Sequence, residues 1–396
     1  MSVLRTAISS LGIAAVVMSY AAGRSVTFQW MGPEISYSSA IVGGNATRMF
    51  GSFFISGNPS NEFEGTKQLT AVWHGSDVPT PLFQLNSPAY RGRINDVSDM
   101  WQVGEIRDFY ANDGLERPVL WSSLPGSTQY LDLGGYDRGM AYGTDGMRIV
   151  GAASFVEWLE FGPDYRIAIP LPTRAVTWGS DGILRRLNSD GAESALARGV
   201  QGLTVVGSIS DADGHSDATF WTLSPQPSDD QVVTSTLQVI TPANAAYAEA
   251  VGIRGGVIVG RAGFPAGASA QPHAVLWRGP GWTFTDLHPN RFDWSSANWT
   301  DGEFQTGWVS MTTEESPTSF LVRAALWRGT KASYTDVHAL IPVPVEESIA
   351  TCVIRDGEDM IVAGTARVLN GYWRAFKLVL PGTKRAPAAP PRPPRR

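Results

Sequence analysis

Seven glycines at similar spacing divide this chain into repeats. Each glycine follows two aliphatic or polar residues, as in QVG, IVG and VAG, and successive glycines are 47 to 57 residues apart. A segment of the type AVLW follows 14 to 27 residues later and ends in Trp, except in the last repeat, where Leu378 takes its place. This regular spacing predicts seven structural units. The marker residues are Gly51, Gly104, Gly151, Gly207, Gly260, Gly307 and Gly364, with Trp73, Trp121, Trp178, Trp221, Trp277 and Trp327.

Each unit has the pattern of four short strands. In the fifth unit, four segments of β-branched, aromatic and alternating apolar residues are separated by Gly, Pro and Ser, at 246–253, 257–263, 273–279 and 283–289. Pro and Gly make up 68 of 396 residues, which suits many turns. We therefore predict an all-β, seven-bladed β-propeller of four-stranded antiparallel blades. The predicted blades are approximately 36–87, 88–135, 136–189, 190–242, 243–289, 290–340 and 341–382.

The seventh unit has sequence for three strands only. The segment VTFQWMGP, 26–33, resembles PLFQLNSP, 81–88, which ends the first unit, although no unit precedes it. We predict that 26–33 pairs with the last blade and closes the ring, because an open array would expose unpaired strand edges.

The order of motifs in the fifth unit, AVGIRGGVIVGRAG, then HAVLWRG, then FTDLHP, resembles the extracellular HAF-type repeats. The resemblance spans about 36–380 and is closest in that unit. Arg174, Arg323 and Arg374 replace the His elsewhere, and the DLG ending survives in LDLGG, 131–135. This resemblance implies an exported protein with propeller-like repeats and implies no catalytic residues.

The two ends of the chain differ from the repeats. Residues 1–24 have a basic residue, an apolar run from Leu11 to Ala22 and small residues, the order of a secretory signal peptide. The alternatives are an uncleaved membrane anchor and a disordered N-terminus. We expect a secreted, extracellular or periplasmic protein with no transmembrane span after leader cleavage. Residues 384–396, rich in Pro and Arg, read as a disordered tail that could contact an anionic envelope.

Charge and cysteine content exclude some classes of protein. The whole chain has a net charge of −6, of which the tail contributes +5 and the leader +2, so residues 25–383 carry −13. This acidic body argues against nucleic acid as a partner. Cys352 is the only cysteine, so an intrachain disulfide is excluded.

Several recurring residues are candidates for structure or for binding. The repeated Trp are either sugar-stacking platforms or, as we favour, packing between successive blades, and the repeated Gly are interpreted as points of close backbone approach. An aromatic residue also recurs 13 to 15 residues before five of the glycines, where each unit begins. These aromatics either pack inward or surround the channel mouth as a carbohydrate or peptide site. They are Tyr37, Tyr90, Tyr136, Tyr247 and Trp294.

Acidic residues suggest two further sites. In SDADGHSD, 210–217, Asp211, Asp213 and Asp217 surround a glycine, which fits either an ordinary turn or a weak calcium loop. Carboxylates on or after the inner strands could converge in the channel, or could be solvated loop acids. These are Asp96, Asp99, Asp145, Glu249, Asp301 and Asp356.

The five histidines are scattered over four units, and His288 and His338 occupy equivalent positions. No nucleophile elbow, zinc-protease or phosphate-loop motif is present. The sequence thus favours a non-catalytic binding or surface protein that requires no cofactor, with a carbohydrate or a protein surface as its ligand. The alternatives are a carbohydrate-active hydrolase or lyase that uses channel carboxylates, and a structural scaffold.

Overall fold

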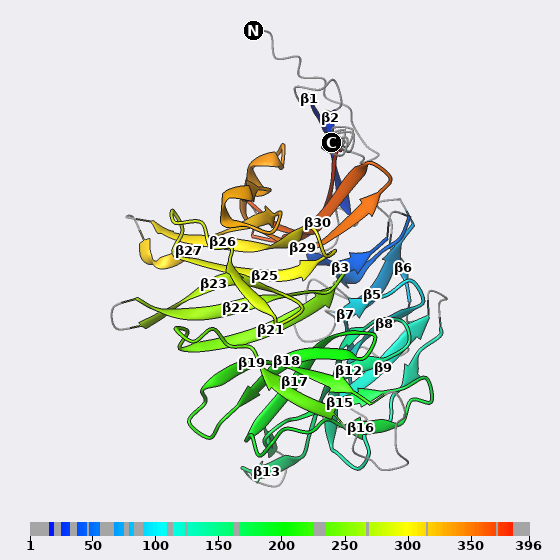
Figure 1. The fold of residues 1–396 in the computed structure, drawn as a ribbon. Coiled ribbons are helices and arrows are strands. Elements are labelled where there is room, and N and C mark those ends of the chain that lie inside the picture. Colours follow the sequence, from blue (N-terminus) through cyan, green and yellow to red (C-terminus); the bar gives the residue numbers. More distant parts are fainter. Residues whose placement is uncertain are drawn as a thin grey trace, which may run out of the picture.

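A computed structural model describes most of the chain between residues 16 and 382. The described ranges are 16–19, 25–31, 38–45, 47–55, 67–74, 79–82, 90–108, 114–122, 126–161, 166–224, 235–266, 269–313, 316–369 and 371–382. These residues form β-strands and two 3-10 turns, η1 (Lys331–Ser333) and η2 (His338–Leu340), which confirms the all-β prediction (Figure 1). Among them, no helix has the length and apolar character needed to span a membrane.

The strands pair in chain order as successive antiparallel sheets. The first two units share one sheet, because a single parallel bridge joins Gln68 to Arg91. Its strands are β3 (Ser38–Gly44), β4 (Met49–Ile55), β5 (Lys67–Trp73), β6 (Thr80–Pro81), β7 (Tyr90–Val97), β8 (Trp101–Asp108), β9 (Glu116–Ser122) and β10 (Gln129–Tyr130).

The third and fourth units form separate four-stranded sheets. The third has β11 (Arg138–Thr144), β12 (Ile149–Ser154), β15 (Arg174–Trp178) and β16 (Leu184–Arg186). An additional hairpin, β13 (Val156–Glu160) and β14 (Arg166–Pro170), extends between its second and third strands. The fourth has β17 (Ser194–Gln201), β18 (Thr204–Ser210), β19 (Ser216–Leu223) and β20 (Ser235–Val239).

The fifth and sixth units repeat the same order. The fifth has β21 (Tyr247–Arg254), β22 (Val257–Ala266), β23 (Ser269–Arg278) and β24 (Thr283–Asp286). The sixth has β25 (Trp294–Thr300), β26 (Gln305–Thr313), β27 (Ser316–Trp327) and β28 (Thr335–Asp336).

The last sheet combines both ends of the described chain. Its order is β29 (Val345–Asp356), β30 (Asp359–Val368), β31 (Trp373–Leu380), β2 (Ser25–Met31) and β1 (Val16–Ser19). β2 pairs antiparallel with β31 from Thr27↔Val379 to Met31↔Ala375, the position where the sequence lacks a fourth strand. Residues 32 and 33 of the predicted segment, most of the leader and the tail lie outside the described residues.

Consecutive units contact each other through their first strands. β3, β7, β11, β17, β21, β25 and β29 contact one another in this order, and β29 also contacts β3. A serine on a first strand accepts a hydrogen bond from the third strand of the preceding unit: Ala274 N to Ser295 Oγ at 2.8 Å and Ala324 N to Ser348 Oγ at 3.0 Å. Ala375 N donates equivalently to Ser39 Oγ at 2.9 Å, so the last unit contacts the first in the same way.

The repeated glycines face a β-bulge in every unit. Each lies on a second strand, and a Cβ there would stand 1.8 to 2.0 Å from a carbonyl oxygen of the first strand. The first strand skips one residue of register at this point in all seven units. Only glycine permits this approach, because any side chain would overlap the carbonyl.

The repeated tryptophans form the packing between units. All six are fully buried. Trp178, Trp221 and Trp277 donate their indole N–H to a carbonyl at the end of the preceding unit, Asp132, Asn188 and Ile240, at 2.6 to 2.8 Å. Their recurrence is therefore explained by burial between neighbouring sheets rather than by an exposed stacking platform.

Candidate functional site

The residues skipped at five of the seven bulges line one cavity. It has a volume of about 300 Å³ and is lined by residues of β7, β8, β11, β17, β21 and β25. Five consecutive units contribute their bulge residue to its wall, namely Asn95, Tyr142, Arg198, Val251 and Asn298. We call this the central cavity. The β-bulges that the glycines allow therefore also place side chains of different types around the central cavity.

Asp96 and Arg254 form a buried polar pair in the central cavity. The carboxylate of Asp96 accepts the N–H groups of Val97 and Thr144, both at 2.8 Å, and lies 3.6 Å from Arg254 Nη2. Burial raises the pKa of Asp96, although Arg254 and the two N–H groups oppose this effect. The guanidinium of Arg254 also lies 4.2 Å from the ring centroid of Trp299. These contacts hold Asp96 and Arg254 in place.

A second group of polar side chains surrounds Tyr142. The guanidinium of Arg198 lies 4.5 Å from the Tyr142 ring centroid. Burial raises the pKa of the Tyr142 phenol, so the phenol stays protonated at neutral pH. Among the described residues, Arg93 and Arg198 have no carboxylate within ion-pair distance.

Glu105 completes the charged lining of the central cavity. Asn95 donates its amide Nδ2 to Glu105 and also to the carbonyl of Ala141, at 2.9 Å in the second case. Burial raises the pKa of the Glu105 carboxyl, and the nearby Arg93 opposes this increase. A carboxyl with a raised pKa in a cavity is a candidate acid or base, or a ligand contact.

The structure places three of the five predicted aromatic residues, Tyr136, Tyr247 and Trp294, outside the central cavity. Tyr136 packs on Phe155 with 4.8 Å between ring centroids, and Trp294 stacks on Phe320 at 3.9 Å. A Cβ on Gly263 would stand 2.1 Å from Cε1 of Tyr247, so this ring covers its neighbouring strand. Tyr37 lies outside the described residues, as does the side chain of Tyr90. The three described rings pack within their own units, and a binding role for the set stays a prediction.

Only one of the six predicted channel carboxylates, Asp96, lines the central cavity. Glu249 is bound by Arg261 Nη2 at 2.9 and 3.1 Å. Asp145 accepts N–H groups of its own turn and that of Gly202, the last at 2.8 Å. Asp99 and Asp356 are exposed, and Asp301 belongs to a different cavity, described below.

The predicted calcium loop has the contacts of a turn. Oδ1 of Asp211 accepts the N–H groups of Asp213 and His215 at 3.1 and 2.9 Å, and Asp217 lies 3.6 Å from His215. Asp211 and Asp213 are exposed. Within the described ranges, no group of three or more His, Cys, Asp or Glu residues is placed to hold a metal ion. The loop geometry thus gives calcium no support.

The histidines of the fifth unit are structural. His273 and His288 stack with 3.9 Å between ring centroids, and His273 Nδ1 lies 3.3 Å from Asp286. The buried His288 contacts Ser295 Oγ at 2.8 Å and the carbonyl of Phe292 at 2.9 Å. Burial lowers the pKa of His288 to about 4. Because this serine and histidine are buried between two units, we assign them to packing.

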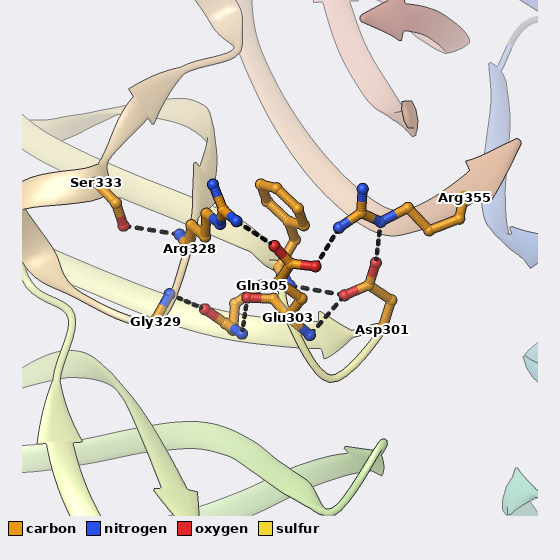
Figure 2. A network of polar contacts seen from close by, with 8 residues as sticks. Asp301, Glu303, Gln305, Arg328, Gly329, Ser333 and Arg355 are labelled. Carbon is orange, nitrogen blue, oxygen red and sulfur yellow. Dashed lines mark hydrogen bonds and ion pairs between the residues drawn. The ribbon is translucent and has the colours of Figure 1, made fainter. Parts of the chain in front are cut away.

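A larger cavity of about 790 Å³ lies between the sixth and seventh units, and we call it the lateral groove. Its floor is apolar and includes Val26, Leu326 and Leu380. Figure 2 shows the polar network at its edge, where Arg355 reaches Asp301 at 3.3 Å and Glu303 at 2.5 Å, while Arg328 reaches Glu303 at 2.6 Å. The arginines of the lateral groove are therefore neutralised by carboxylates.

Sequence reasoning missed Glu105 and the bulge residues. A signal for the latter exists, since the bulge residue lies nine residues before the glycine in each of the first six units. The residue type at this position changes from unit to unit, so no repeated motif marks it.

No family model matches the chain, and no curated protein matches it. Three similar solved structures are a protein of unknown function from Dyadobacter fermentans, the β-propeller domain of the trilobed protease from Pyrococcus furiosus, and a sialidase from Trypanosoma rangeli.

The Dyadobacter protein is 10% identical, with a TM-score of 0.44, covering 89% of this chain and 97% of that one. The Pyrococcus domain is 9% identical, with a TM-score of 0.41, covering 76% and 97%. The sialidase is 9% identical, with a TM-score of 0.37, covering 92% and 57%. At these values we draw no conclusion about function from the similarity.

Proposed function

We propose that this chain is an exported, seven-bladed β-propeller that binds a small polar ligand, of the carbohydrate class, in its central cavity without catalysis. The contacts of β29 with β3 and the pairing of β2 with β31 support the ring. The leader pattern of residues 1–24 supports export.

The observation that carries the binding proposal is the convergence of bulge residues. Asn95, Tyr142 and Asn298 come from three different sheets and bring amide and phenol groups to one cavity. Trp299 adds an aromatic wall. A concave site with a few convergent polar groups beside an aromatic ring suits a small hydroxylated ligand, and about 300 Å³ lies at the lower end of the volumes of ligand pockets.

A glycan array with the purified protein tests this proposal. The double variant Tyr142→Phe/Asn298→Ala removes two polar groups from the cavity, and we expect roughly thirtyfold weaker binding, since each of the two lost hydrogen bonds contributes about 1 kcal/mol. Trp294→Ala is the matched control, because that ring lies outside the cavity. Loss in Trp294→Ala alone would favour the channel-mouth aromatics, and no binding by the wild type would favour a scaffold.

A second candidate, a carbohydrate-active hydrolase or lyase, is favoured by one observation. Asp96 and Glu105 both line the cavity, and burial raises the pKa of each, as acid catalysis requires. Asp96 is fixed by its backbone N–H donors and by Arg254, so Glu105 is the better acid. Chromatography of glycans incubated with wild type and with Glu105→Gln distinguishes the two functions. Shortened products from the wild type that disappear in the variant would establish an enzyme.

A further inference from the structure

The charged lining of the central cavity is not balanced. Arg93, Arg198, Arg254, Asp96 and Glu105 line it. Arg254 and Asp96 neutralise each other, because their side chains lie 3.6 Å apart and Arg254 also donates to the carbonyl of Val97 at 2.7 Å. Arg93 and Arg198 then remain against Glu105 alone.

Arg198 is held in place by a ring rather than by an acid. Its guanidinium lies over Tyr142 at 4.5 Å, and no described carboxylate lies within ion-pair distance. A guanidinium stacked on an aromatic face keeps its N–H donors at the edge available for another partner. The half-buried Arg198 therefore presents unused donors to the cavity.

Glu105 does not fully compensate for the two arginines. It accepts the amide of Asn95 and forms no ion pair with Arg93, the residue opposite it on the neighbouring strand. Arg107 and Arg138, which also lie close to Glu105, are bound instead to Glu116. The cavity thus has an excess of positive charge in a chain whose residues 25–383 carry −13. A positively charged cavity in a negatively charged chain attracts an anion.

We propose that the central cavity selects an acidic sugar, with Arg93 and Arg198 as the anchors of its carboxylate. This rests on the proposed carbohydrate binding and specifies its ligand class. A planar guanidinium binds a carboxylate through two parallel hydrogen bonds, and the charge strengthens both. The amides of Asn95 and Asn298 lie in the same wall and can contact the sugar hydroxyls.

Calorimetric titration of the full chain with paired sugars tests the inference. Glucuronate, galacturonate and mannuronate are each compared with the neutral hexose, and inorganic phosphate is included. We expect at least one uronate to bind at least tenfold more tightly than its hexose, with a preference that decreases as salt is added. Arg198→Gln should bring the ratio of uronate affinity to hexose affinity close to one, whatever its effect on hexose binding itself, and Arg198→Lys should restore the ratio in part.

Arg328→Gln is the matched control, because Arg328 belongs to the lateral groove. Its titration curves should coincide with those of the wild type, and thermal melting should show that all variants are folded. Equal binding of uronate and hexose would overturn the inference but leave the proposed function intact. Phosphate binding as tight as that of the uronates would also overturn it, by showing a general anion site. Failure of every sugar to bind would contradict the proposed function itself.

Discussion

The central cavity and the lateral groove both contain arginines beside an aromatic ring, but they differ in what neutralises those arginines. In the lateral groove, Arg355 lies 4.6 Å from the ring centroid of Phe304 and is bound by Asp301 and Glu303. In the central cavity, Arg198 lies over Tyr142 with no acid beside it. The same side chain thus stabilises a turn in one place and is available to a ligand in the other.

This difference originates in the backbone. Asp301 is held in its turn by the N–H groups of Glu303 and Phe304, at 2.8 and 2.6 Å, so the turn itself brings an acid to the lateral groove. At a bulge, the extra residue has no partner in the ladder. Arg198 is such a residue, so no residue of the neighbouring strand is paired with it, whereas Arg93 is paired with Glu105 in the β7–β8 ladder.

The largest effect should come from removing the glycine that permits a bulge. A Cβ on Gly104 would stand 1.8 Å from the carbonyl of Arg93, inside the β7–β8 ladder, so we expect Gly104→Ala to cost about 3 kcal/mol or more. Gly382 in the lateral groove is the matched site, since its Cβ would stand 1.8 Å from the carbonyl of Glu358.

Gly382 lies outside the ladder, after β31 ends at Leu380, and its N–H donates to the carboxylate of Asp359 rather than to a strand, so a shift there breaks no ladder hydrogen bond and Gly382→Ala should cost about 1 kcal/mol or less. Urea unfolding of both variants gives the two costs. Equal costs would show that the bulges are no more constrained than the end of the last sheet, and would remove the backbone basis of the comparison.

A smaller effect should distinguish the paired arginine from the unpaired one. Arg355→Gln leaves Asp301, whose side chain is 15% exposed, without its ion pair, and we expect a loss of about 1 kcal/mol that decreases with added salt. Arg198→Gln removes no ion pair and should cost less than about 0.5 kcal/mol. Denaturant midpoints at low and high salt measure both, and a greater loss for Arg198→Gln would mean that its charge is structural.

The sequence predicted the repeated framework because the same physical requirement recurs in each unit. Gly207 and Gly260 must both avoid a carbonyl, and Trp221 and Trp277 must both fill the space between two sheets, so the residue type is constant. The partner of the last strand could also be inferred. The seventh unit lacks sequence for a fourth strand, and 26–33 is a strand-like segment that belongs to no other unit.

The central cavity could not be predicted in the same way. Its bulge residues differ in type, as Tyr142, Arg198 and Val251 show, because the backbone constrains their position and not their chemistry. Recurrence instead drew attention to Tyr136 and Trp294, which recur at the start of first strands and pack on their own units.

The smallest effect is a change in the pH dependence of stability. Burial raises the pKa of Glu105 in the folded protein above its ordinary value, which the unfolded chain retains. Between these two values the folded protein binds more protons than the unfolded chain, so the free energy of unfolding falls as pH rises through this interval. Glu105→Gln should make that fall shallower, and Asp96, whose pKa is also raised, is present in both proteins and cancels in the difference.

The matched substitution in the lateral groove, Glu303→Gln, removes the partner of Arg328 and Arg355 and should instead lower the midpoint at neutral pH. Urea unfolding at intervals from pH 4 to 8 measures both slopes. An unchanged slope in Glu105→Gln would mean that Arg93 compensates the burial of Glu105. The cavity would then contain one arginine fewer for an anionic ligand, and the contrast with the lateral groove would depend on Arg198 alone.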